Sequence, residues 1–266
     1  MFTLKYYRDA LEKAGLVRES NIGEENVEYI SYNSNDVREN TLFICKGAHF
    51  KLEYLKSAEE KGACCYVSET KHDTDCGYII VSDIRHAMGI IVNIYYENIW
   101  SKLNLIGITG TKGKSTTTYF VKYILDEYLK AKRKPQSGVI SSIDTYDGVE
   151  SFESHLTTPE PLDLHRHFKN AVDSSIEYMT MEVSSQALKY DRVYGVEFGV
   201  GCYLNIGEDH ISDIEHPNFD DYFYSKMKLF DQTKIACVSL DTLRRDEVLK
   251  AASKCERMIT FSTEDR

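Results

Sequence analysis

Apolar residues along this chain recur at two spacings, one typical of strands and one typical of helices. In the first part of the chain, short apolar runs predict strands at 28–32, 41–45, 64–67 and 78–81. Helical spacing predicts helices at 4–15, 51–61 and 84–96. We therefore expect a small α/β unit at the start of the chain.

After residue 103 the same alternation continues with longer elements. Strands are predicted at 105–109, 138–140, 178–183, 200–205, 235–240 and 257–262. Helices are predicted at 116–130, 161–173 and 242–253. Repeated strand–helix units imply a mostly parallel sheet that binds ligands at the carboxyl ends of its strands. Residues 100–102 fall just before the first of these strands, so we expect domains at 1–101 and 102–266.

Residues 105–116 carry the most informative pattern in the chain. An apolar run changes into a glycine-containing turn that ends in Gly-Lys-Ser, and a helical pattern follows. Such a loop directs backbone N–H groups and a helix N-terminus at an anion. We expect Lys114 to reach the terminal phosphates of a nucleotide and the Ser115 hydroxyl to bind Mg²⁺. The usual phosphate-loop pattern has glycine where Ile108 stands, and the alternative is an ordinary turn with a surface lysine.

Net charge, cysteine content and the length of apolar runs disfavour several classes of protein. The net charge of −10 disfavours a dedicated nucleic-acid surface. The seven cysteines are odd in number, none is in a Cys-x-x-Cys pair, and no signal peptide precedes them, which favours reduced thiols in a cytoplasm. No apolar run approaches the ~20 residues of a membrane span. We expect a soluble cytoplasmic protein that does not insert into membranes.

Two strand ends offer further metal or phosphate ligands. Glu182 closes an apolar strand and offers a carboxylate opposite Ser115, unless it is an ordinary acid exposed to solvent. Asp209 and His210 follow the next strand and offer oxygen and nitrogen ligands, with a loop hydrogen bond as the alternative. Together with the phosphate loop, these positions point to ATP–Mg²⁺ chemistry without naming the acceptor.

Pattern alone assigns no clear role to four other residues. Thr157 and Thr158 precede a helix start and suit a second phosphate or carboxylate, but they also resemble plain helix capping. Arg192 suits bidentate anion binding or is an isolated surface arginine. Lys226 has the pattern of a helical surface lysine, which gives it no role.

Five segments follow one another in the order found in Mur ligases, and they lie at 109–115, 156–160, 181–188, 205–210 and 216–226. The chain resembles this family along nearly its whole length, and 216–226 resembles the members of Gram-positive cocci that add lysine to the peptidoglycan stem peptide. The family's Thr-Gly-Thr-x-Gly-Lys-Ser/Thr loop accounts for Ile108.

The resemblance implies ATP-dependent amide-bond formation through an acyl phosphate, with ATP and Mg²⁺ as cofactors. The implied substrates are UDP-MurNAc-L-Ala-D-Glu and a diamino acid, with L-lysine favoured over meso-diaminopimelate. A small N-terminal α/β domain would bind the UDP substrate, and a central domain would bind ATP. Family members carry a third domain that is expected to be absent from these 266 residues, which predicts a catalytically incomplete chain. The alternative is a stand-alone protein that binds ATP or a UDP-sugar without ligating.

Residue roles follow from the same resemblance. The nucleotide-binding residues that it implies are Gly110, Thr111, Lys112, Gly113, Lys114, Ser115 and Thr116. The metal ligands that it implies are Ser115, Glu182, His210 and a carbamylated Lys226. The substrate-binding residues that it implies are Ser34, Thr157, Thr158, Ser184 and Arg192. Lys114, His210 and Lys226 are thereby assigned to catalysis. Residues 31–35 depart from the family by keeping Ser34 without its usual charged neighbours.

Overall fold

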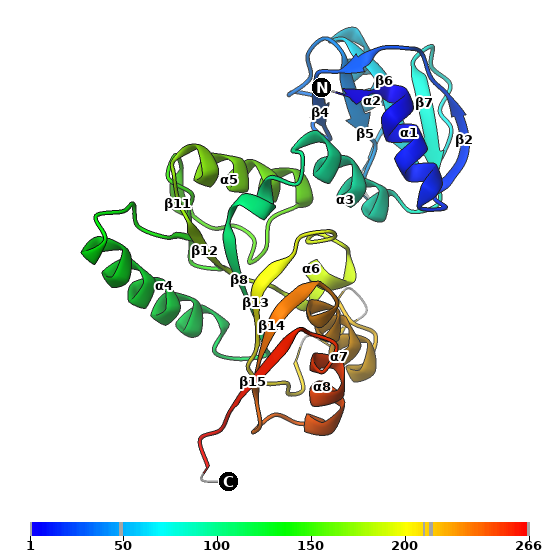
Figure 1. Ribbon diagram of the computed structural model, residues 1–266. Coiled ribbons are helices and arrows are strands. Elements are labelled where there is room, and N and C mark those ends of the chain that lie inside the picture. The colour runs from blue at the N-terminus through cyan, green and yellow to red at the C-terminus, as the bar shows by residue number, and fades with distance from the viewer. Residues whose placement is uncertain (1, 48–49, 210, 213–214, 265–266) are drawn as a thin grey trace. The chain divides into compact units, whose positions relative to one another are not determined.

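The computed structural model describes residues 2–47, 50–209, 211–212 and 215–264. It divides the chain into two compact units, Met1–Asn98 and Ile99–Arg266 (Figure 1). Both units are α/β, and the larger sheet is mostly parallel, so the predicted fold class is confirmed. Among the described residues, no helix combines the length and apolar character needed to cross a membrane.

The first unit is built on a five-stranded sheet. Its strands, in spatial order, are β2 (Val17–Asn21), β7 (Gly77–Val81), β6 (Ala63–Ser68), β5 (Thr41–Ile44) and β4 (Tyr29–Ser31). Only the β2–β7 pair is antiparallel. Two short strands, β1 (Phe2–Thr3) and β3 (Asn26–Val27), form a separate pair. The helices are α1 (Leu4–Lys13), α2 (Leu52–Glu60) and α3 (Ile84–Tyr95).

The second unit is built on an eight-stranded sheet. Its strands, in spatial order, are β11 (Ser151–Glu153), β10 (Asp144–Tyr146), β9 (Gly138–Ile140), β12 (Tyr178–Glu182), β8 (Asn104–Thr109), β13 (Phe198–Tyr203), β14 (Thr233–Ser239) and β15 (Arg257–Phe261). Six strands, β9, β12, β8, β13, β14 and β15, run parallel to one another. At the β9 edge, β10 and β11 form a hairpin, and β10 pairs antiparallel with β9. The apolar pattern did not predict this hairpin, because both strands are short and largely polar.

Helices cover both faces of this sheet. They are α4 (Lys114–Ala131), α5 (Pro161–Asp173), α6 (Ser185–Lys189), α7 (Phe219–Met227) and α8 (Arg245–Ala252), with 3₁₀ turns η1 (Ile99–Lys102) and η2 (Lys228–Gln232). Figure 1 shows α4 on one side of the sheet and α7 and α8 on the other. The core on the α7–α8 side includes Tyr203, Phe223, Val238 and Val248. This packing sets α7 against the carboxyl end of β13.

One side of α4 is apolar yet faces outward. Its large side chains retain much of their exposure, with Phe120 at 65%, Tyr123 at 62%, Ile124 at 70% and Tyr128 at 52%. They recur at the spacing of one helix face. The opposite face is buried at Thr118, Lys122 and Leu129. Polar contacts also hold α4 to the sheet, because Asp126 accepts from the N–H and the hydroxyl of Ser137, just before β9, at 2.7 and 2.6 Å.

Candidate functional site

The loop between β8 and α4 has the geometry of a phosphate cradle. Gly113 directly precedes α4 with φ of 83°, a left-handed conformation that favours glycine. No side chain among the described residues caps this helix. Its first-turn N–H groups are therefore left for another acceptor, and the helix dipole adds positive potential there. The expected strand, loop and helix are present.

Two lysines converge on this loop. The Lys114 Nζ donates to the carbonyl oxygen of Gly110 at 3.0 Å and to that of Thr111 at 3.3 Å. The Lys226 Nζ donates to the same Gly110 oxygen at 3.1 Å. Burial lowers the pKa of Lys114 from its ordinary value. These two amines on one carbonyl place positive charge beside the loop, which an anion such as a phosphate would neutralise.

The interpretation of Lys226 as a surface lysine is wrong. Its side chain is 1% exposed, because α7 turns this face toward the phosphate loop, whereas Tyr224 on the same helix is 53% exposed. Burial, reinforced by the charge of Lys114, lowers the pKa of Lys226 to about 7. A substantial share of this amine is consequently neutral near pH 7 and able to act as a nucleophile.

Glu182 ends β12, Ser115 lies in the first turn of α4, and Ser142 connects the two. The Ser142 N–H and hydroxyl donate to Glu182 Oε1 at 3.0 and 3.1 Å, and the hydroxyls of Ser142 and Ser115 are 3.1 Å apart. Glu182 is 1% exposed, so the alternative of a solvent-exposed acid is wrong. A buried carboxylate beside two hydroxyls is an all-oxygen donor set that fits Mg²⁺. Sequence reasoning missed Ser142, because only the fold brings the end of β9 to this place.

The loop after β13 is described only in part. His210, expected to bind metal and take part in catalysis, lies outside the described residues. Asp209 precedes it and forms an ion pair with Lys112 at 2.8 Å. Asp209 therefore contributes negative charge beside the phosphate loop.

A cavity of about 200 Å³ adjoins the two lysines. Its lining includes Lys114, Thr157, Thr158, Ser184, Arg192 and Lys226. The structure thus brings together four of the five residues expected to bind substrate. The fifth, Ser34, lies in the first unit, and its position is described only within that unit.

The geometry excludes two alternatives for the residues of this cavity: that Thr157 and Thr158 only cap a helix, and that Arg192 is an isolated surface arginine. The residue that precedes α5 is Glu160, and no side chain among the described residues caps that helix. Thr158 instead donates to the Glu182 carbonyl at 2.9 Å and accepts from the Ser184 N–H at 3.0 Å. Arg192 is not isolated, because it donates to the Thr158 carbonyl at 3.2 Å and pairs with Glu160 at 2.9 Å.

A buried histidine connects α6 with α7. His216 Nε2 is 2.9 Å from the Ser185 hydroxyl, and its Nδ1 is 2.6 Å from Asp221. Burial lowers the pKa of His216, so the ring is neutral near pH 7. A neutral ring that donates to Asp221 through Nδ1 accepts from Ser185 through Nε2. This network holds the cavity side of α6 against the helix that carries Lys226.

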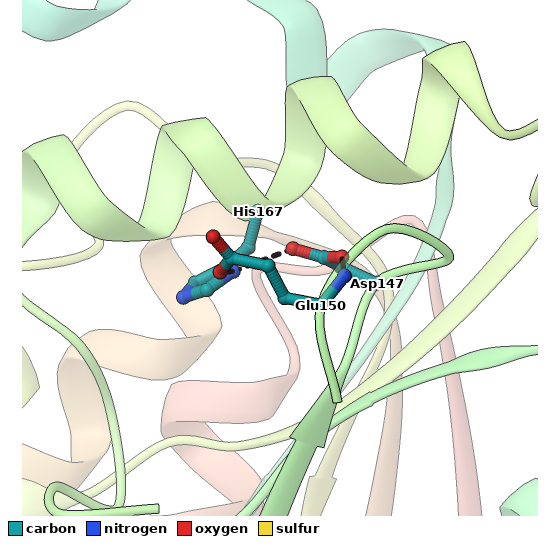
Figure 2. Close-up of side chains that lie close together, drawn as sticks. All are labelled: Asp147, Glu150 and His167. Atoms are coloured by element: carbon teal, nitrogen blue, oxygen red, sulfur yellow. Dashed lines mark hydrogen bonds and ion pairs between the residues drawn. The ribbon is translucent and has the colours of Figure 1, made fainter. Parts of the chain in front are cut away.

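A second cluster of possible metal ligands lies under the β10–β11 hairpin. Figure 2 shows Asp147, Glu150 and His167 directed toward one another, although the sequence offered no convincing metal spacing for its histidines. Asp147 already accepts four hydrogen bonds, from the N–H groups of Val149 and Glu150 and from the side chains of His167 and Asn170, at 2.7–3.0 Å. Glu150 pairs with Arg166. We therefore assign this cluster to stabilising the hairpin turn.

This assignment predicts that Asp147→Asn lowers the free energy of unfolding by about 2 kcal/mol at pH 7. Burial alone would raise the pKa of Asp147, but its four hydrogen bonds outweigh burial and lower the pKa to about 2. The unfolded pKa is higher, so the stabilising contribution is complete above about pH 4 and is lost as the pH falls toward 2.

Urea denaturation of the parent and the variant between pH 2 and pH 7 measures this effect. The difference in unfolding free energy should shrink below pH 4. Asp173→Asn is a matched control, because among the described residues Asp173 pairs only with Lys169, on the exposed surface of α5. A pH-independent difference for Asp147→Asn would contradict the assignment.

Comparison with known proteins identifies the family of this chain and shows how much of its relatives' length it covers. The profile of the Mur ligase middle domain matches residues 108–266. UDP-N-acetylmuramoyl-L-alanyl-D-glutamate–L-lysine ligase of Enterococcus faecalis is 45% identical over 242 residues, which cover 86% of this chain and 47% of that protein. The ligase of the same name from Streptococcus pneumoniae is 42% identical over 250 residues, 91% of this chain and 51% of that protein.

A solved UDP-N-acetylmuramoyl-L-alanyl-D-glutamate–2,6-diaminopimelate ligase has a similar fold. The TM-score is 0.75 at 21% sequence identity, and the match covers 91% of this chain and 50% of that one. The chain thus spans about half the length of the relatives that it matches.

Proposed function

This chain belongs to the Mur ligase family, and we propose that it forms the UDP-substrate-binding and ATP-binding parts of a ligase of peptidoglycan precursor synthesis. The reaction proposed is ATP-dependent addition of a diamino acid to UDP-MurNAc-L-Ala-D-Glu. L-Lysine is favoured as the diamino acid, because relatives 42–45% identical are named as L-lysine ligases.

The observation that carries this proposal is the meeting of Lys114 and Lys226 on the Gly110 carbonyl beside the cavity. In the proposed reaction, a substrate carboxylate oxygen attacks the γ-phosphorus of ATP, and ADP leaves. The amine then attacks the carbon of the acyl phosphate, loses a proton and displaces phosphate. Negative charge concentrates on the phosphoryl oxygens in the first step, and Lys114 with the first-turn N–H groups of α4 is placed to stabilise it.

Magnesium, when bound, would neutralise charge on the phosphates. Ser115 and Glu182 would hold one ion, and the family resemblance adds His210 for a second. Lys226 would join them as a carbamate: its neutral amine adds to the carbon of CO₂, an N–C bond forms and one proton leaves. The low pKa of Lys226 supports this step, because only the unprotonated amine reacts.

The substrate side of the proposal uses the remaining cavity residues. Thr157, Ser184 and Arg192 would contact the muramoyl dipeptide, with Thr158 fixing the backbone between Glu182 and Ser184. Ser34 in the first unit would contact the uridine. All seven cysteines are free in the structure, which supports the cytoplasm as the place of action.

Isothermal titration calorimetry of this chain with ADP–Mg²⁺, and separately with UDP-MurNAc-L-Ala-D-Glu, tests the proposal. Saturable binding of both ligands is expected, and a folded chain that binds neither would refute it. A phosphate-release assay with ATP, the UDP-dipeptide and L-lysine separates the two candidate functions. Release that requires all three would exclude a binding-only protein, whereas binding without release favours that alternative for residues 1–266.

A further inference from the structure

We infer that Asn205 is a positioning residue that fixes the phosphate loop in its binding shape before a nucleotide arrives. The inference deepens the proposed function, because it rests on nucleotide binding at this loop. Asn205 follows β13, and β13 pairs in parallel with β8 up to the register Tyr203–Thr109. The fold therefore places Asn205 beside the start of the loop.

The Asn205 side chain uses both ends of its amide on the loop backbone. Its Oδ1 accepts from the N–H of Thr111 at 3.1 Å and from that of Lys112 at 2.9 Å. Its Nδ2 donates to the Lys112 carbonyl at 3.0 Å. The main-chain oxygen of Asn205 also accepts from the Thr111 N–H at 3.1 Å. Asparagine provides this combination of donor and acceptor, and aspartate or alanine does not.

The side chain of Thr111 is anchored separately. Its Oγ1 accepts from the N–H of Gly207 at 3.0 Å and lies 3.0 Å from the hydroxyl of Tyr222. Tyr222 belongs to α7, and the Lys226 Nζ lies 4.6 Å from the centre of its ring. The loop is thus fixed on one side by the chain after β13 and on the other by the helix that carries Lys226.

These contacts decide which N–H groups remain for a phosphate. Those of Thr111 and Lys112 are directed at Asn205, so the anion-binding donors belong to the turn at Gly113 and the first turn of α4. The orientation of these donors depends on the preceding residues being held in place. Without the amide, nucleotide binding would have to order the loop, and that entropic cost would weaken affinity.

Two variants and one control test the inference on this chain, with ADP as the ligand. Asn205→Ala should weaken ADP binding about 10-fold or more in calorimetry and speed amide hydrogen exchange at Lys112. Exchange at Thr111 should change less, because its N–H keeps the main-chain oxygen of residue 205 as an acceptor. Asn205→Asp keeps the acceptor but adds a negative charge. It should keep both amides protected while weakening ADP binding, and added salt should reduce that loss.

Asn104→Ala is the matched control. Asn104 begins β8, at the opposite end of the strand that leads into the loop, and its Nδ2 donates to the Glu177 carbonyl at 3.0 Å. Its loss should leave ADP affinity and exchange at Thr111 and Lys112 unchanged.

An Asn205→Ala chain that binds ADP as tightly as the parent would overturn the inference. So would rapid exchange of Thr111 and Lys112 in the parent, and this readout needs no nucleotide. A parent chain that fails to bind ADP while keeping both amides protected would instead refute the proposed nucleotide site and leave the Asn205 contacts established.

Discussion

Replacing Lys114 by alanine is expected to weaken binding of ADP or ATP to this chain roughly 100-fold, since a partly buried lysine–phosphate contact contributes several kilocalories per mole. The Lys114 ammonium bonds two loop carbonyls, at 3.0 and 3.3 Å, and a bound phosphate would draw it away from them. Calorimetric titration with ADP–Mg²⁺ measures the loss. The free energy of unfolding should change little, because burial disfavours the Lys114 charge.

Lys130→Ala is the appropriate control. Lys130 lies on α4 as well, but it is exposed, and within the part of the chain that the structure describes it pairs only with Glu127. It should leave nucleotide affinity unchanged. A Lys114→Ala chain with reduced thermal stability and unaltered ADP affinity would show that Lys114 supports the fold and not the phosphate. Alanine at position 114 should also raise the pKa of Lys226, since the Lys114 charge contributes to lowering it.

The second large expected effect is a CO₂ adduct on Lys226 in preference to the other lysine side chains. With a pKa of about 7, roughly half of this amine is neutral at pH 7, against about 0.03% of a lysine with the ordinary value of 10.5. Only the neutral amine reacts with CO₂, so Lys226 should form a carbamate faster than surface lysines do. Nuclear magnetic resonance with ¹³C-bicarbonate should show one lysine carbamate signal, separate from that of the α-amino group, that increases as the pH rises through 7.

Lys226→Met should abolish that signal. It should also raise the free energy of unfolding by about 2 kcal/mol at pH 7, because a buried amine whose pKa is lowered destabilises the folded state wherever the unfolded chain binds the proton. The gain should diminish as the pH approaches 10. A variant that is less stable than the parent, or that keeps the carbamate signal, would contradict the assignment of Lys226.

The phosphate loop could be predicted because its evidence is local. Strand, turn and helix follow one another within residues 104–131, and each has a sequence signal of its own. The same holds for most strands of the larger sheet, which read as continuous apolar runs because both faces of a parallel sheet are covered. The β10–β11 hairpin has no such signal, because its strands are short and largely polar.

Residues that depend on distant partners could not be predicted from the chain alone. Lys226 lies on a helix of mixed pattern, and its burial follows from the phosphate loop packed against it. Ser142 and Asn205 act through contacts with Glu182 and Lys112, which belong to other strands or loops. Family resemblance supplied the role proposed for Lys226. Asn205 begins one of the segments that carry the resemblance, but neither resemblance nor pattern gave a role to Ser142 or Asn205.

The outward apolar side of α4 has a practical consequence for the chain in solution. This surface, formed by Phe120, Tyr123, Ile124 and Tyr128, favours hydrophobic association between chains. The net charge of −10 opposes that association by electrostatic repulsion. Salt shortens the reach of that repulsion from about 30 Å at 0.01 M to about 8 Å at 0.15 M and leaves the apolar attraction in place. The chain should therefore stay in solution best in low-salt buffer at a pH well above its isoelectric point of about 5.3. Adding salt should promote its aggregation.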